Sequence, residues 1–230
     1  MIKNDELKTT GRQRIVIVVI AIFMLLSTFA LYASVIIGGG SSSTTSTADN
    51  EKVERFNELY QKYLNAVDKQ SAELSSKYFD TFVSYKSRVK AYNAADITTT
   101  TAKDLVVGTG AEVTDENFVN YSAYYIGWLS DETIFDSSFD DAANPTSLKA
   151  PLEGTTNMIE GWLEGIVGMK IGGVREISIP SALAYGDQAQ GSIPANSPLK
   201  FVVMLIDPVG DPEFAESEEL QQLMNDLYGV

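Results

Sequence analysis

The segment Met158–Gly186 reads M-I-E-G-W-L-E-G-I-V-G-M-K-I-G-G-V-R-E-I-S-I-P-S-A-L-A-Y-G. Upstream of it stand Y-I-G-W at Tyr125–Trp128 and F-D-S-S at Phe135–Ser138. Glycines divide these stretches into short elements, aromatic side chains recur in them, and one carboxylate directly follows an aromatic residue. This combination suggests a shallow apolar pocket with a polar group among its aromatic walls.

The elements around this segment predict an antiparallel sheet curled over one short helix, which is an α+β fold. Apolar residues at three-to-four spacing predict a helix over Met158–Val167, and the glycine pair at 172–173 ends it. Strands are predicted at 105–107, 118–129, 134–135, 174–179 and 199–206, where β-branched and aromatic residues concentrate. We assign residues 97–210 to this domain.

Six motifs in this domain resemble the FKBP-type peptidyl-prolyl isomerases and follow the order of that family. They are Y-Y-I-G-W-L at 124–129, T-I-F-D-S-S at 133–138, M-I-E-G-W-L-E-G at 158–165, G-M-K-I-G-G at 168–173, A-L-A-Y-G at 182–186 and S-I-P-A-N-S-P-L-K-F-V-V at 192–203. The resemblance covers nearly all of residues 102–210. It implies an enzyme that accelerates cis/trans isomerisation of X-Pro bonds and that needs neither a cofactor nor a metal ion.

Carried over motif by motif, the resemblance implies two groups of site residues. They are Tyr125, Phe135, Asp136 and Tyr185 as catalytic residues, and Met158, Ile159, Trp162, Ile193 and Phe201 as substrate-binding residues. In this view Trp162 is the floor under the proline ring, the Tyr185 hydroxyl and the Ile159 backbone N–H hold substrate carbonyls, and Asp136 acts electrostatically. Aromatic residues at strand spacing also fit an ordinary core.

The sequence departs from the family pattern in three segments. Phe139-Asp140-Asp141 stands where many relatives carry a basic residue that pairs with a pocket carboxylate. Residues 144–154 lack the usual Phe before Pro151-Leu152. The loop 187–191 is short, and we expect it to shape client preference. The first two departures suggest that Asp136 is held differently and that one pocket wall is reshaped.

The composition excludes several other kinds of chemistry. The chain has no cysteine and no histidine, which removes thiolate chemistry and the commonest general base and metal ligand. Its net charge of −14, from 31 acidic and 17 basic residues, makes nucleic acid a poor partner, because tracking phosphates needs clustered Lys and Arg.

The N-terminal region predicts a membrane anchor. Residues 15–37 carry no charge, and as a helix they would span ~34 Å, enough for a hydrocarbon core. Four basic residues lie within 1–14 and none follows until Lys52, so we expect a cytoplasmic N-terminus and an extracytoplasmic remainder, with the protein in the cell membrane as a single-pass protein. The alternative is a signal peptide cleaved near Ala33-Ser34.

Three segments flank the anchor and the domain. Residues 38–48 predict a flexible linker rich in Gly, Ser and Thr. Residues 49–96 predict a helical arm of one or two helices. The arm packs on itself or on the following domain in one interpretation. In the other, it holds clients or a second copy of the chain in a homodimer. Residues 211–230 predict an acidic C-terminal helix that docks on its own module or binds another protein.

Together these features predict an isomerase for X-Pro bonds in unfolded, exported polypeptides near the membrane. The alternative is a membrane-tethered binding module that kept the pocket, lost most turnover and acts as a chaperone or adaptor. A purely structural coiled-coil arm is a further interpretation of residues 49–96.

Overall fold

The computed structural model describes residues 47–118 and 120–228. These residues divide into two units: residues 68–209, called here the sheet unit, and residues 47–67 with 210–228, called the helical unit. The expected N-terminus of residues 1–14, the membrane helix of 15–37 and most of the linker lie outside the described residues. In the part of the chain that is described, no helix is both long enough and apolar enough to cross a bilayer.

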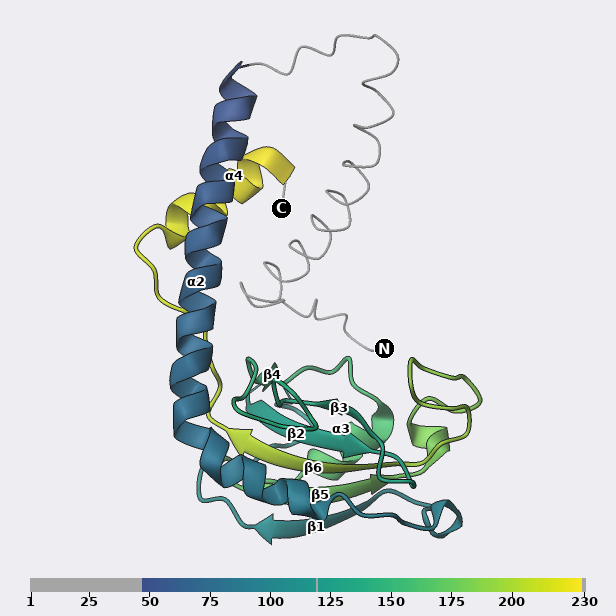
Figure 1. Cartoon of the computed structure of the whole chain (residues 1–230). Coiled ribbons are helices and arrows are strands. Elements are labelled where there is room, and N and C mark those ends of the chain that lie inside the picture. The colour runs from purple at the N-terminus through teal and green to yellow at the C-terminus, as the bar shows by residue number, and fades with distance from the viewer. Residues whose placement is uncertain (1–46, 119, 229–230) are drawn as a thin grey trace, which may run out of the picture. The chain divides into compact units, whose positions relative to one another are not determined.

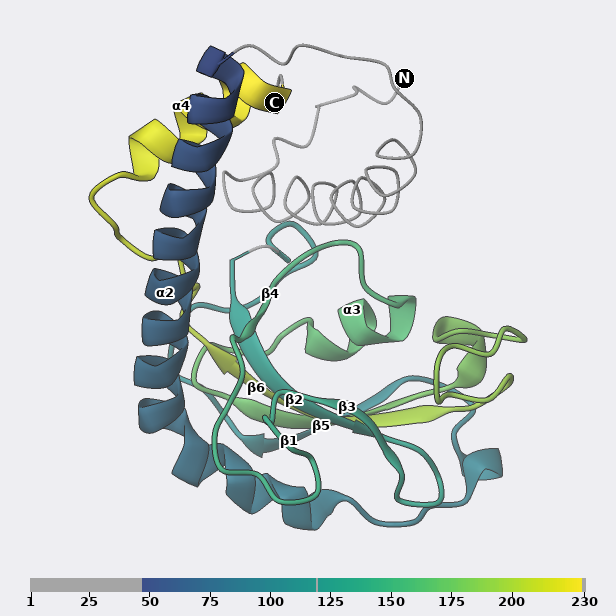
Figure 2. The same ribbon diagram turned by 45° about the horizontal axis from the view of Figure 1, so that its top comes forward.

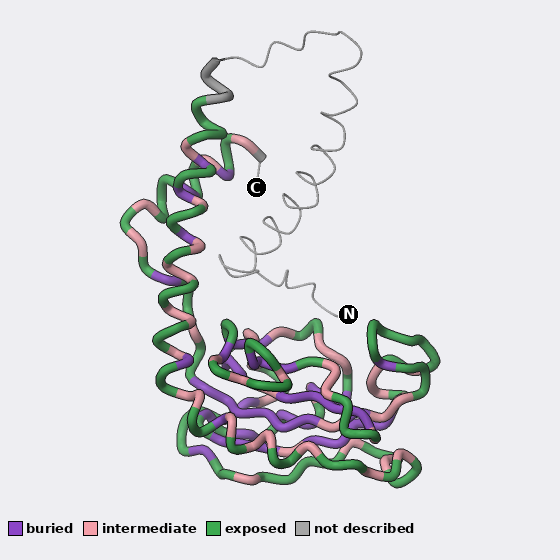
Figure 3. The backbone as a smooth tube through the Cα atoms, in the orientation of Figure 1, coloured by how far each residue is buried: buried purple, intermediate pink, exposed green. Residues whose placement is uncertain are grey.

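The sheet unit contains one antiparallel sheet with the strand order β1-β5-β6-β2-β3, and β4 pairs with β2 beside this path (Figure 1). The strands are β1 (Thr101–Val106), β2 (Ser122–Trp128), β3 (Ile134–Ser137), β4 (Leu152–Glu153), β5 (Val174–Ile179) and β6 (Leu199–Ile206). The apolar run of β6 lies between β5 and β2, and all but one of its residues are buried, as expected for a central strand (Figure 3).

Alternate side chains of each strand point to opposite faces, and both faces of the sheet are covered (Figure 2). One face packs on α3 (Glu160–Ile166), and we call this layer the helix-side core. A methyl group on Gly161 or Gly165 would stand 2.2 or 2.5 Å from an isoleucine Cγ2 of β5. These two glycines therefore let the helix approach the strand closely.

The opposite face packs on the C-terminal part of α2 (Thr47–Val83) and on the chain that follows it, a layer we call the arm-side core. Phe82 is fully buried there, with ring centroids 6.0 Å from Tyr124 and 5.5 Å from Phe139. The chain continues through the 3-10 helices η1 (Ser84–Arg88) and η2 (Ala94–Asp96). Between them, the Tyr92 hydroxyl donates to the Pro198 carbonyl oxygen at 2.8 Å.

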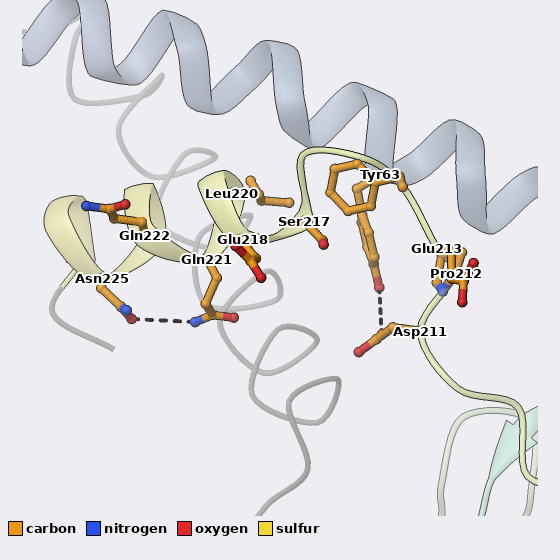
Figure 4. A pocket seen from close by; sticks show the side chains of 11 residues that line it. Tyr63, Asp211, Pro212, Glu213, Ser217, Glu218, Leu220, Gln221, Gln222 and Asn225 are labelled. Carbon is orange, nitrogen blue, oxygen red and sulfur yellow. Dashed lines mark hydrogen bonds between the residues drawn. The ribbon is translucent and has the colours of Figure 1, made fainter.

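The helical unit pairs the first part of α2 with α4 (Ser217–Tyr228). Phe56, Leu59 and Tyr63 are buried together with Leu220 and Met224. Three exposed ion pairs flank this core: Lys52–Asp226 at 2.8 Å, Arg55–Glu219 at 2.7 Å and Lys62–Glu216 at 2.8 Å. The Tyr63 hydroxyl also reaches Asp211 at 3.5 Å, beside an open pocket lined by the 211–225 segment (Figure 4).

The predicted α+β fold with an antiparallel sheet and a short helix is confirmed. The strands at 174–179 and 199–206 have the predicted bounds. The predicted arm of residues 49–96 differs: one continuous helix ends at Val83, and the rest is 3-10 turns and extended chain. The C-terminal helix forms its core with the arm residues of the helical unit.

Candidate active site

Two neighbouring strands bring a phenol and a carboxylate together at the start of the site. Tyr125 of β2 and Asp136 of β3 lie near each other because the antiparallel register pairs Gly127 with Asp136. The Tyr125 hydroxyl donates to Asp136 Oδ2 at 2.5 Å. The other carboxylate oxygen accepts from the Ser137 backbone N–H at 2.8 Å. The two residues therefore form a hydrogen-bonded pair with a fixed orientation.

Four aromatic rings meet beside this pair, each nearly perpendicular to the next. Trp162 lies 5.8 Å from Tyr125 and 5.3 Å from Phe201, with interplanar angles of 87° and 90°. Phe201 in turn lies 5.5 Å from Phe135 at 86°. Edge-to-face contacts of this kind are the favoured geometry for aromatic pairs, so the rings support one another. They form an apolar cluster on the α3 side of the sheet, in which Trp162 and Phe201 are buried and Tyr125 and Phe135 are partly buried.

Gly127 makes this ring arrangement possible. A Cβ atom at this position would stand 2.6 Å from Phe135 Cζ and 2.7 Å from Phe201 Cε1. Real carbon contacts are not that short, so any other residue would displace the two rings. The glycine of the Y-I-G-W motif is therefore explained by the close approach of two aromatic walls.

Burial and charge keep the Tyr125 hydroxyl protonated. Burial, followed by the hydrogen bond to Asp136 and the charges of Asp136 and Tyr185, raises the pKa of Tyr125 well above its usual value near 10. Within the described residues, no Lys or Arg forms an ion pair with Asp136. The carboxylate is held by a phenol and a backbone N–H.

The other predicted site residues lie around the same rings. Met158 and Ile159 are half-buried against the helix-side core, and Ile159 is the residue that precedes α3. Ile193 is buried in that core and pairs with Gln190 across the 187–192 loop. Tyr185 is 37% exposed and lies outside the core. The structure thus gathers the predicted residues on one face of the sheet and leaves Tyr185 at its solvent-exposed margin.

Comparison with known proteins identifies the family to which this domain belongs. The family model "FKBP-type peptidyl-prolyl cis-trans isomerase" matches residues 110–206, which lie within the sheet unit. FK506-binding protein 2 of Debaryomyces hansenii is 42% identical over 95 residues, which are 41% of this chain and 67% of that protein. An FK506-binding protein of Neisseria meningitidis serogroup C is 43% identical over 37% of this chain and 75% of its own length. This chain belongs to the FKBP-type peptidyl-prolyl cis-trans isomerase family.

The similarity to other FKBP-type isomerases concerns one domain. FK506-binding protein 4 of Chaetomium thermophilum is 38% identical over 46% of this chain, but the match spans only about a fifth of that protein. Among solved structures, the crystal structure of AtFKBP13 aligns over 48% of this chain and 93% of its own with 32% identity and a TM-score of 0.38. The arm before residue 110 and the segment after 206 lie outside the family model.

The sequence analysis did not indicate two residues that support this FKBP-type site, Tyr121 and Ser138. The Tyr121 hydroxyl accepts from the Trp162 indole N–H at 3.2 Å, and this bond fixes the orientation of the indole ring. The Ser138 hydroxyl accepts from the Tyr125 backbone N–H at 2.9 Å. The alternation of side chains along a strand could have indicated the position of Tyr121, because residues 121, 123 and 125 lie on the same face. No pattern in the sequence indicates Ser138.

Proposed function

We propose that the FKBP-type domain binds X-Pro segments of polypeptides on the Trp162 face and accelerates their cis/trans isomerisation by stabilising the twisted amide. The observation that carries the proposal is the Tyr125–Asp136 pair set against perpendicular aromatic rings. The proline ring rests on Trp162, between Tyr125, Phe135 and Phe201. Met158, Ile159 and Ile193 complete the apolar lining.

The chemistry suits a site with few polar groups. Isomerisation breaks amide resonance, with a barrier of ~18–20 kcal/mol, and forms no covalent bond. A catalyst needs only to bind the twisted amide better than the planar one. The twisted amide is less polar than the planar one, so an apolar ring surface favours it. Asp136 acts through its charge, and the exposed Tyr185 hydroxyl is free to turn toward a substrate carbonyl.

The first test is a protease-coupled isomerisation assay on the full-length protein with a series of short X-Pro peptides. Acceleration that falls with Phe135→Ala and with Asp136→Ala is the expected result. Phe214→Ala and Asp80→Ala are matched controls outside the ring cluster and should retain wild-type rates. Two of the relatives described above are named FK506-binding proteins, so FK506 is a suitable competitor, and we expect it to suppress the acceleration.

A folded protein that binds the peptides without accelerating isomerisation would overturn the enzymatic proposal for this chain. It would favour the binding module, in which the same ring surface holds proline-containing segments for a chaperone or adaptor role. Suppression of client aggregation by a Tyr185→Phe, Asp136→Ala double variant at the wild-type level would then support that role.

We further propose that the clients are exported polypeptides and that the domain lies on the extracytoplasmic side, tethered to the membrane by residues 15–37. The support is the uncharged 23-residue run and the basic residues that precede it. The chain has no cysteine, so one introduced thiol reports the side of the membrane directly. In intact cells, a membrane-impermeant maleimide should label Asp187→Cys and spare Asp5→Cys. The reverse pattern, or labelling of neither, would contradict this topology.

A further inference from the structure

The C-terminal part of α2 touches a loop that leads directly to the Tyr125–Asp136 pair. We propose that Ser75, Phe82 and Lys86 are positioning residues for this pair: they hold the loop of residues 139–149, and the loop holds the end of β3. All three precede the family-matched residues 110–206. The inference rests on the proposed function, and it adds a role for the arm in that same site.

The 139–149 loop is closed by contacts of its own. Phe139 and Leu148 form an antiparallel bridge at its base. The Asp140 backbone N–H donates to the Ser147 carbonyl oxygen at 3.1 Å, and one Asp140 carboxylate oxygen accepts from the Thr146 N–H at 3.0 Å. These contacts close the loop on itself, and its position relative to the sheet depends on what it packs against.

The arm supplies three contacts to this loop, at three different points. The Ser75 hydroxyl accepts from the Leu148 backbone N–H at 2.8 Å in a buried position. The Phe82 ring packs on Phe139 at 5.5 Å, and both side chains are fully buried. The Lys86 ammonium donates to the Ala143 carbonyl oxygen at 2.6 Å. A polar contact near the middle of the loop, a second near its C-terminal end and an apolar contact at its base fix the loop against the arm.

The loop in turn holds the strand that carries Asp136. The Lys149 backbone N–H donates to the Ser138 carbonyl oxygen at 2.8 Å, and its ammonium donates to the Ser137 carbonyl oxygen at 3.2 Å. Ser138 and Tyr125 exchange two hydrogen bonds, each 2.9 Å long. A continuous set of contacts therefore runs from the arm through the loop to both members of the pair.

The position of β3 explains why this support matters. It is a four-residue strand at the edge of the sheet and pairs only with β2. Its register with β2 is interrupted between Gly127 and Trp128, so few regular ladder bonds define where Asp136 lies. Short edge strands open more readily than central ones. Small displacements of a reacting group lower rates strongly, so a support outside the sheet is expected to affect turnover.

The test uses Ser75→Ala and Lys86→Ala in the full-length protein, with Lys86→Arg as the conservative variant. Each alanine variant should lower kcat/KM ~3–10-fold, and Lys86→Arg should restore most of the loss. Ser76→Ala and Lys69→Ala are matched controls on exposed positions of the same helix and should leave kcat/KM unchanged. Circular dichroism and urea midpoints confirm that each variant is folded at the assay temperature.

A second readout does not depend on turnover. The backbone amide resonances of Tyr125, Ser137 and Ser138 should shift in Ser75→Ala and Lys86→Ala and stay in place in the two controls. Folded alanine variants with wild-type kcat/KM and unshifted amides would overturn the proposal. If the wild-type protein itself shows no turnover, the amide shifts alone decide between a positioning role and none.

Discussion

The Tyr125 side chain is partly buried and its hydroxyl lies beside the Asp136 carboxylate, and both conditions favour the neutral phenol. The phenol is therefore a permanent donor to Asp136 at ordinary pH, and the carboxylate needs no cation to keep its place. Asp136 itself is exposed, so its charge is available at the edge of the ring surface. The pair orders a charge next to an apolar floor without a proton transfer.

The hydrogen bond of the pair can be removed without changing the ring. We expect Tyr125→Phe to lower kcat/KM ~10-fold, equivalent to about 1.4 kcal/mol, which is typical for one lost hydrogen bond to a charged group. The protease-coupled assay measures the change. Tyr60→Phe removes a phenol from the helical unit and should have no effect, so equal losses in both variants would count against a specific role for Tyr125.

The raised pKa of Tyr125 also predicts a pH dependence. Stability that comes from a raised pKa is fully present below the unfolded-state value near 10 and is lost as the pH rises through the folded-state value. We expect the free energy of unfolding to fall above about pH 10 in the wild type and to fall less in Tyr125→Phe.

Because the chain has no histidine, kcat/KM should stay flat from about pH 6 to about pH 9. A bell-shaped profile centred near neutrality would contradict this assignment.

Gly127 offers a test of the ring geometry. Gly127→Ala forces Phe135 and Phe201 apart, and we expect it to destabilise the fold by about 1–3 kcal/mol and to lower kcat/KM. Urea denaturation and the isomerisation assay measure the two effects. At Gly210 an added Cβ meets nothing within 4 Å, so Gly210→Ala should be neutral in both.

At the scale of elements, the strands could be predicted and the loops could not. The apolar runs at 174–179 and 199–206 carry their own signal, because buried strands need continuous apolar side chains. No sequence signal indicated that the helix ends at Val83. Tyr85, Val89 and Tyr92 continue the helical spacing, yet they pack on the sheet from 3-10 and extended backbone. Periodicity shows that these side chains are buried but not which backbone presents them.

The 139–149 loop is an element that depends on one carboxylate. The Thr146 hydroxyl, the Thr146 N–H and further backbone N–H groups donate to Asp140 and lower its pKa below the usual value near 4. A lowered pKa stabilises the fold above the unfolded-state value, and this contribution is lost as the pH falls through the folded-state value. We therefore expect Asp140→Ala to reduce hydrogen-exchange protection of Thr146 at neutral pH. The difference in Thr146 protection between the wild type and the variant should shrink in acid. Equal protection of Thr146 in the two proteins at both neutral and acidic pH would refute the role of Asp140 in capping the loop.

At the scale of the whole molecule, the chain has two separately packed units. The sequence could indicate which side chains lie around Trp162, because the family motifs fall within residues 124–203 of the sheet unit. Their roles in binding and turnover stay predictions. The pairing of α4 with Phe56, Leu59 and Tyr63 could not be predicted from the sequence. An amphipathic pattern indicates that one helix face is buried but not which residues cover it. The exposed ion pairs around this contact contribute little compared with its apolar core.

The helical unit should respond to mutation independently of the isomerase. We expect Leu220→Ala to cost the helical unit about 2–5 kcal/mol, because Leu220 is only 3% exposed. Hydrogen exchange should show lower protection across residues 56–63, with kcat/KM unchanged. Gln222→Ala, on the exposed side of α4, is the control. A parallel loss of kcat/KM in Leu220→Ala would contradict the independence of the two units.

We propose that one set of aromatic rings both holds the proline and accelerates its isomerisation. The most direct measurement is exchange NMR on the full-length protein with an X-Pro peptide, recorded together with intermolecular contacts from the proline ring. We expect faster cis/trans exchange of the peptide and proline contacts to Trp162, Tyr125 and Phe201, with both signals lost on addition of FK506. Faster exchange with the proline contacting other residues, or contacts to Trp162 without faster exchange, would contradict it.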